Sequence, residues 1–160
     1  MRISLNTFNW ADNILAAFIF FTRLPFWRLR QPNPHAYETV VEHWPLTGWL
    51  TGGLTAVALW GGSMLLPYTT AVAVALLLRV LLTGALHEDG LADFCDGFGG
   101  GGNDRERILA IMKDSHIGTY GVLGLVFYYL LLASCLLSMT PEKAAITIMA
   151  ADPFCKMIAA

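Results

Sequence analysis

The chain has 160 residues, of which 56% are hydrophobic and only 14% are charged, and its net charge is −2. Soluble globular domains carry roughly a quarter charged residues, so this chain has too little polar surface to cover itself in water. Its few basic residues are dispersed, which argues against a nucleic-acid partner. The composition predicts an all-α fold, a polytopic transmembrane helical bundle in contact with the lipid bilayer.

The amino-terminal part, residues 1–45, is predicted to lie at the membrane surface. The apolar run 14–22 is too short to span a bilayer, and Trp27 and Arg28 follow it closely. We expect an interfacial or re-entrant helix there, followed by a polar loop over 28–45. No small-residue cleavage site follows a clean apolar core, so a removed signal peptide is not expected.

The remainder, residues 46–160, is predicted to form the transmembrane bundle of a single integral membrane domain spanning 1–160. Apolar runs over 46–66, 71–86 and 119–139 approach or reach the length of a bilayer crossing. A last helix is expected to begin near Pro141, and its pattern stops at residue 160 without a capping signal. We therefore expect the bundle to be incomplete at its carboxyl end.

The charges of the loops predict how the chain is oriented in the membrane. Arginine and lysine occur in 23–45 and in 97–118, whereas the turn 67–70 has none. Crossings near 46–66 and 71–90 place both basic loops on one side, which the positive-inside rule makes cytoplasmic. The segment 87–118 then lies at the cytoplasmic end of the second crossing.

Residues 87–99 read HEDGLADFCDGFG and concentrate four acidic side chains within nine positions. If the second transmembrane helix continues through 87–97, Asp89, Asp93 and Asp96 fall within a stripe roughly 60° wide. Like charges on one stripe repel, and each carboxylate costs about 2.5–3.5 kcal/mol at membrane depth unless it is compensated. Asp114, on the return segment, can supply a fourth carboxylate.

Oxygen ligands of this kind suit Mg²⁺, Mn²⁺ or Ca²⁺, so the acidic stripe favours a divalent-cation site. The alternative interpretation is that the aspartates only cap a helix end, since Asp-Gly pairs are common in turns. That alternative explains a single aspartate well. It explains three on one face poorly, because like charges need a partner.

The residues after the acidic stretch suit phosphate. The glycine run 99–102 can expose backbone N–H groups to an anion, although a flexible linker is the simpler interpretation. Arg105, Arg107 and Lys113 suit a diphosphate beside a metal, or else anchor the loop by its positive charge. His87 and His116 are candidate general bases, or polar groups at the membrane boundary. A cation beside arginines at a membrane surface indicates phosphoryl transfer.

The motif resembles the signature of the cobalamin synthase family, also called adenosylcobinamide-GDP ribazoletransferases. The resemblance is densest over 83–124, TGALHEDGLADFCDGFGGGGNDRERILAIMKDSHIGTYGVLG, and the upstream FFTRLP (20–25) fits the same family. The chain departs from the family pattern at Glu88, where an apolar residue is commoner, and at His116, where an arginine is common. Family members also extend well past residue 160.

The resemblance implies a Mg²⁺-dependent integral membrane enzyme of the bacterial inner membrane, with its active site facing the cytoplasm. It would join adenosylcobinamide-GDP to α-ribazole or its 5′-phosphate and release GMP. The resemblance implies that the metal ligands and catalytic residues are Asp89, Asp93, Asp96 and Asp114. The substrate-binding candidates are His87, Arg105, Arg107, Lys113, Ser115 and His116.

Two other functions remain open at this point. Spaced aspartates also occur in CDP-alcohol phosphotransferases, but those carry an Ala-Arg pair after the first Asp-Gly, and here Gly90 is followed by Leu91, Ala92 and Asp93. A divalent-cation transporter is the third possibility. Transporters usually place such carboxylates at the bilayer midplane rather than at a helix end beside a basic loop.

Overall fold

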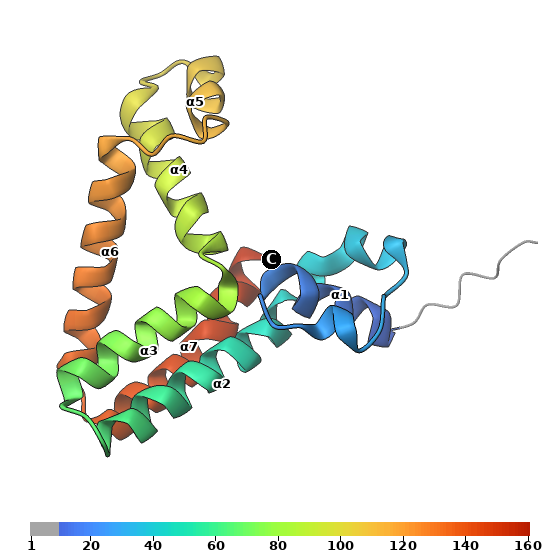
Figure 1. Cartoon of the computed structure of the whole chain (residues 1–160). Helices are drawn as coiled ribbons and strands as arrows, with labels where there is room; N and C mark the ends of the chain where they lie inside the picture. The colour runs from blue at the N-terminus through green and yellow to red at the C-terminus, as the bar shows by residue number, and fades with distance from the viewer. Residues whose placement is uncertain (1–9) are drawn as a thin grey trace, which may run out of the picture.

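The computed structural model describes residues 10–160, which form helices and no strand (Figure 1). There are two 3₁₀ segments, η1 (Phe26–Arg28) and η2 (Pro34–His43), and η2 lies in the stretch 28–45 predicted as a polar loop. The α-helices are α1 (Trp10–Phe21), α2 (Trp44–Ser63), α3 (Tyr68–Thr83), α4 (Leu86–Gly100), α5 (Arg105–Met112), α6 (Thr119–Leu137) and α7 (Pro141–Ala159). The prediction of an all-α fold is confirmed for this range.

Among the described helices, α6 alone is both long and apolar enough to cross a membrane. Helices α3 and α4 meet the same criteria only when taken together, as a pair bent by 90°. The predicted crossing 46–66 does form a helix, α2, but α2 does not meet them. The polytopic membrane bundle therefore stays a prediction.

The expectation that the second helix continues through 87–97 is wrong. Helix α3 ends at Thr83, and both Gly84 (φ 64°) and Ala85 (φ 61°) adopt the left-handed conformation before α4 begins. Glycine reaches this conformation without steric cost, which makes it the usual helix terminator. A side chain at Gly84 would also collide with Arg23, whose backbone N–H donates to Leu82 O at 2.7 Å. The chain therefore turns sharply at this point.

Helix α2 packs against both α3 and α7, and together they form the main core, in which Leu59, Val72 and Ala144 are buried (Figure 1). Two glycines on α2 allow the close approach of α7. A Cβ at Gly48 would lie 2.5 Å from Pro153 Cα, and one at Gly52 would lie 2.9 Å from Asp152 Cβ. Small residues at this spacing let two helix backbones come into contact.

Helix α1 lies apart from this core. Ala16 and Ala17 on α1 pack with Ala36 and Val40 of η2 in a second buried cluster. The short apolar helix predicted over 14–22 is therefore present, and the polar segment after it folds back onto it.

Helix α4 leads away from the α2–α3–α7 layer towards α5, and α6 returns alongside the far end of α4 (Figure 1). The predicted glycine loop is partly helical, because α4 continues to Gly100. A Cβ at Gly99 would collide with Tyr120, and one at Gly101 would collide with Ile108. These glycines therefore allow close packing of α5 and α6 on α4, although Gly99 itself stays exposed while Gly101 is buried.

We predict that Gly48→Ala destabilises the fold by about 1–3 kcal/mol, because the new methyl group enters the space that Pro153 occupies. The matched control is Gly53→Ala on the same helix, where a Cβ would meet no atom within 4 Å. Without a clash, an alanine in a helix is neutral or stabilises by up to roughly 1 kcal/mol. Thermal unfolding of the two purified variants measures the difference, and equal midpoints would contradict this account of α2–α7 packing.

Candidate functional site

A polar cavity of about 260 Å³ lies between α4 and the segment 112–117. We call it the acidic cavity. Asp89 and Asp93 line it from α4, and Asp114 lines it from the other side. Lys113, Ser115 and His116 also line it. The structure therefore brings together three of the four aspartates predicted to bind metal and three of the six predicted substrate-binding residues.

Asp89 and Asp93 lie one helical turn apart on α4 and face the segment after α5 because α5 folds back onto α4. Within residues 10–160 neither carboxylate has a hydrogen-bond or salt-bridge partner. Asp93 is partly buried and Asp89 is exposed. Two neighbouring carboxylates without a donor repel one another, so the pair is stabilised by any cation that enters the cavity.

Asp114 contacts His116. Asp114 Oδ1 accepts a hydrogen bond from the backbone N–H of His116 at 3.1 Å and lies 2.6 Å from its ring Nδ1. The hydrogen bond from the His116 side chain lowers the pKa of the Asp114 carboxyl from its ordinary value. The same hydrogen bond raises the pKa of the His116 imidazole. Asp114 is therefore ionised at neutral pH, with one oxygen engaged and Oδ2 facing solvent or a ligand.

Asp96 does not line the acidic cavity, so the predicted set of four metal ligands is not brought together. It is 8% exposed, and its two oxygens accept hydrogen bonds from Gly118 N at 2.7 Å and from Gly121 N at 2.8 Å. These N–H groups belong to the start of α6, where a carboxylate also interacts favourably with the helix dipole. Asp96 therefore connects α4 to the start of α6.

The remaining three aspartates suit a hard cation by their chemistry, since all are carboxylates around one polar cavity. Across residues 10–160, however, no group of three His, Cys, Asp or Glu side chains is arranged to hold a metal ion. The residue types therefore fit a divalent cation, and the ligand geometry is not preformed.

Three predicted substrate-binding residues lie outside the cavity lining. The His87 ring packs on Trp44, with ring centroids 5.3 Å apart, and its buried Nε2 has no hydrogen-bond partner in the described part of the chain. Arg105 and Arg107 are exposed in the first turn of α5, where Asp104 caps the helix by accepting from Arg107 N at 3.3 Å. The two arginines are therefore free to reach a ligand, whereas His87 is packed.

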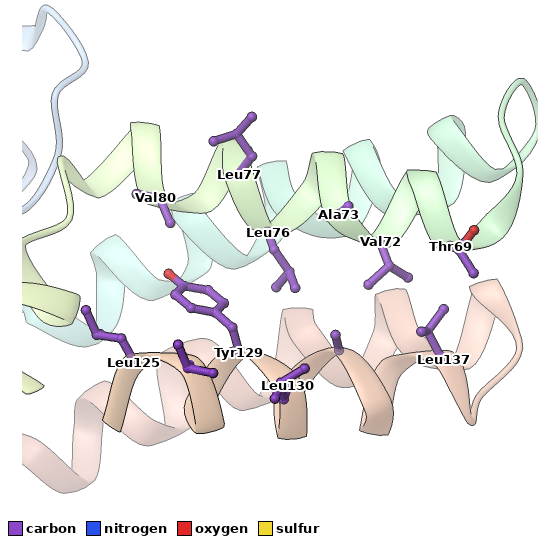
Figure 2. Close-up of a pocket in the computed structure, with 12 residues that line it drawn as sticks. Thr69, Val72, Ala73, Leu76, Leu77, Val80, Leu125, Tyr129, Leu130 and Leu137 are labelled. Carbon is purple, nitrogen blue, oxygen red and sulfur yellow. The ribbon is translucent and has the colours of Figure 1, made fainter. Parts of the chain in front are cut away.

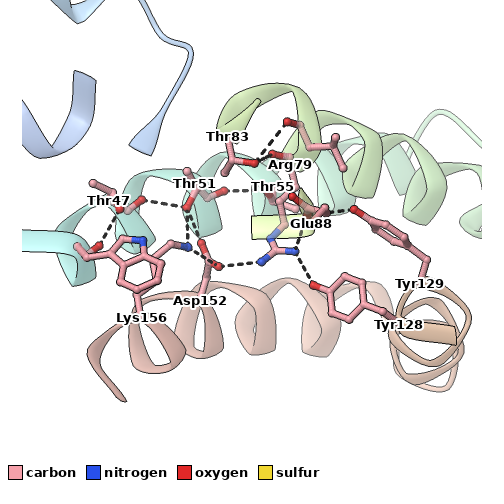
Figure 3. Close-up of polar contacts among 12 residues, drawn as sticks. Thr47, Thr51, Thr55, Arg79, Thr83, Glu88, Tyr128, Tyr129, Asp152 and Lys156 are labelled. Carbon is pink, nitrogen blue, oxygen red and sulfur yellow. Dashed lines mark hydrogen bonds and ion pairs between the residues drawn. The ribbon is translucent and has the colours of Figure 1, made fainter. Parts of the chain in front are cut away.

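A buried cluster of charged side chains was not predicted (Figure 3). Asp152 Oδ1 lies 2.8 Å from Lys156 Nζ and 3.4 Å from Arg79 Nη2, while Thr51 donates to Asp152 Oδ2. Arg79 Nη1 lies 3.8 Å from Glu88 Oε1. We call these four charged residues the ionic cluster. The signal available in the sequence was the i, i+4 spacing of Asp152 and Lys156 in an otherwise apolar helix.

A larger hollow than the acidic cavity lies elsewhere. A groove of about 600 Å³ runs between α3 and α6, and apolar side chains such as Leu76 and Leu130 line it together with Tyr129 (Figure 2). None of the described residues that line this groove is charged. A phosphate bound there would be left without a counter-charge, so the smaller acidic cavity is the candidate functional site.

Comparison with known proteins gives one family. The sequence model of the family described as cobalamin-5-phosphate synthase matches residues 13–160. The adenosylcobinamide-GDP ribazoletransferase of Leptothrix cholodnii is 47% identical over 107 residues, which cover 67% of this chain and 40% of that protein. The protein of the same name from Shewanella baltica (strain OS155) is 37% identical over 152 residues, covering 93% of this chain and 58% of that protein.

The chain therefore spans about half the length of the curated relatives that it matches. No solved structure matches the chain.

The different placement of Asp96 and Asp93 predicts different effects on stability. Asp96→Asn removes one of two acceptors and the charge that faces the start of α6, so it should cost about 1–3 kcal/mol of unfolding free energy. Asp93→Asn loses no partner among the described residues and should leave stability unchanged or slightly higher. Thermal unfolding of the two variants distinguishes these roles, and a stable Asp96→Asn protein would show that Asp96 does not fasten α4 to α6.

Proposed function

The chain belongs to the cobalamin-5-phosphate synthase family, and we propose that it acts as an adenosylcobinamide-GDP ribazoletransferase. In this reaction the ribose 3′-hydroxyl of α-ribazole or its 5′-phosphate attacks the phosphorus nearest the cobinamide. A new P–O bond forms, the bond to the bridging oxygen breaks, GMP leaves with that oxygen, and the hydroxyl proton is released. The observation that carries the proposal is the acidic cavity, in which both halves of the family-like motif meet.

We propose that Asp89, Asp93 and Asp114 hold Mg²⁺, drawn together from their positions around the cavity. A bound divalent cation screens the charge of the diphosphate and of the leaving GMP. Among the described residues no donor engages Asp89 or Asp93, whereas the buried Asp96 and Asp152 have such donors, and this difference supports the assignment. Asp96 is left out of the ligand set, since backbone N–H groups engage both of its oxygens.

The basic residues around the cavity are proposed to bind the diphosphate. Lys113 lies in the cavity wall beside Asp114. Arg105 and Arg107 extend from the exposed start of α5, and a guanidinium can bind a phosphate with two parallel hydrogen bonds. Ser115 and His116 are placed to donate to phosphate oxygens from the same wall.

We propose that the protein lies in the bacterial inner membrane with the acidic cavity facing the cytoplasm. The exposed surface of α6 supports this, because Phe127, Leu130 and Leu131 are each more than half exposed. Apolar surface of this extent is unfavourable in water and suits lipid. The apolar groove between α3 and α6 is explained in the same way (Figure 2). Basic residues beside the cavity agree with the cytoplasmic side.

The family match favours this transferase over a CDP-alcohol phosphotransferase and over a cation transporter. A transporter would use the carboxylates to pass an ion, whereas here the carboxylates share a cavity with Lys113, Ser115 and His116, which suit an anionic substrate. Release of GMP from adenosylcobinamide-GDP separates the three functions directly, because only the ribazoletransferase produces it.

We predict that Asp93→Asn lowers Mg²⁺-dependent GMP release by at least about 100-fold, because a cation ligand is lost while the fold is kept. The measurement is GMP release in membranes that contain the protein, with adenosylcobinamide-GDP and α-ribazole. Glu106→Gln, an exposed carboxylate of α5 outside the cavity lining, is the matched control and should keep full activity. Near-normal turnover by Asp93→Asn would show that Asp93 is not a required metal ligand. Near-normal turnover by the unaltered protein in excess EDTA would show that the reaction needs no divalent cation.

We predict that Arg107→Ala raises the KM for the GDP-linked substrate about tenfold or more with a smaller change in kcat, as loss of a phosphate contact does. Arg28, an exposed arginine of η1, provides the control Arg28→Ala, for which KM should not change. Steady-state kinetics on the two variants make the comparison. An unchanged KM for Arg107→Ala would show that Arg107 does not bind the substrate, and would leave it only the role of a positive charge that anchors the loop on one side of the membrane.

A further inference from the structure

Two charged side chains meet across the bend between α3 and α4 (Figure 3). Arg79 on α3 places Nη1 3.8 Å from Oε1 of Glu88 on α4. Tyr129 of α6 donates its hydroxyl to the same Glu88 oxygen at 3.0 Å. Glu88 is only 6% exposed, so water screens this contact little. The start of α4 is thereby tied to both α3 and α6.

The bend and the ion pair depend on one another. Arg79 and Glu88 are nine positions apart, which in a continuous helix corresponds to about 13 Å along the axis. They meet only because the chain bends by 90° at Gly84 and Ala85. Ala85 carries a Cβ in the left-handed conformation, which costs about 1–2 kcal/mol. An attraction across the bend offsets that cost.

Stability alone does not explain these charges. Buried ion pairs often stabilise a fold no more than apolar side chains of similar size. Moreover, Glu88 Oε2 is buried and has no hydrogen-bond partner within residues 10–160, which is itself unfavourable. A buried charge pair favours one relative arrangement of the two elements that it joins. Here it fixes the direction in which α4 leaves α3.

This direction matters because α4 is held at two points only a few residues from the cavity. Asp96 fastens its far half to the start of α6, and Glu88 fastens its first turn. Asp89 and Asp93 lie between these two points and line the acidic cavity. Asp89 is also the direct neighbour of Glu88, so a displacement of Glu88 moves Asp89 with it.

We propose that Arg79 is a positioning residue: through Glu88 it fixes the bend between α3 and α4 and thereby the places of Asp89 and Asp93 in the acidic cavity. The inference rests on the proposed function for its catalytic consequence. Its structural part, the control of the bend by the Arg79–Glu88 pair, does not.

The structural part is tested by distance measurements between spin labels on Leu77 of α3 and Phe94 of α4, both more than half exposed, with the three cysteines replaced by serine. Glu88→Gln keeps the size of the side chain and removes its charge, so the distance distribution should shift or broaden. Asp152→Asn is the matched control, because it removes the other carboxylate partner of Arg79 without altering α4. It should leave the distribution narrow.

The catalytic part is tested by GMP release from membranes. Glu88→Gln should lower kcat about tenfold or more while the KM for the GDP-linked substrate changes little. Asp152→Asn should lower kcat less, even where both variants lose equal thermal stability. Equal losses in the two variants, or an unchanged distance distribution in Glu88→Gln, would overturn the inference. No GMP release by the unaltered protein would instead reject the proposed function and leave the distance test decisive.

Discussion

Burying a carboxylate in an apolar chain is costly, and the described part of this protein meets that cost by giving each buried carboxylate a cationic or hydrogen-bonding partner. Asp12 lies 2.8 Å from Arg30, and Glu88 accepts from Tyr129 near Arg79. Asp96 accepts from the start of α6, and Asp152 lies beside Lys156 and Thr51. Each of these contacts joins separate segments, apart from the pair within α7. These buried charges therefore add specific connections between segments to the apolar packing of the helices.

Asp89, which is exposed, and Asp93, which is partly buried, do not belong to this group of buried carboxylates. They are close to one another and to Asp114, yet no protein donor neutralises either of them within residues 10–160. Carboxylates left without donors in a cavity that Lys113 also lines fit a site that is completed by a cation and a phosphate. The function proposed for the chain follows from this contrast between paired and unpaired carboxylates.

The sequence pattern predicts α2, α3, α6 and α7, because the turn 67–70 and Pro141 separate the apolar runs that form them. It does not predict the bend at Gly84 and Ala85, since the apolar pattern continues across it. The helical periodicity places Asp89, Asp93 and Asp96 on one face of the helix. It takes no account of how far apart they lie along the helix axis. Asp89 and Asp96 are about 10 Å apart in that direction, too far to share one ion.

The ionic cluster and the packed glycines are tertiary features that the local pattern does not contain. In a straight helix, nine positions would separate Arg79 from Glu88 too far for an ion pair, and only the bend brings them together. Asp152 meets Arg79 only through the packing of α7 on α2. Likewise, Gly99 and Gly101 resemble a flexible linker until Tyr120 and Ile108 are found against them. The sequence shows which residues are charged and which are glycines. Which side chains contact them depends on the tertiary packing of the helices.

The central claim is that Asp89, Asp93 and Asp114 form a cation site. Electron paramagnetic resonance titration of the purified protein with Mn²⁺, which takes the same oxygen ligands as Mg²⁺, tests it without any assay of activity. The account predicts one saturable Mn²⁺ per chain, displaced by excess Mg²⁺, weakened at least about tenfold by Asp93→Asn and kept in Glu106→Gln. Saturable binding that survives Asp93→Asn unchanged, or no binding by the unaltered protein, would contradict it.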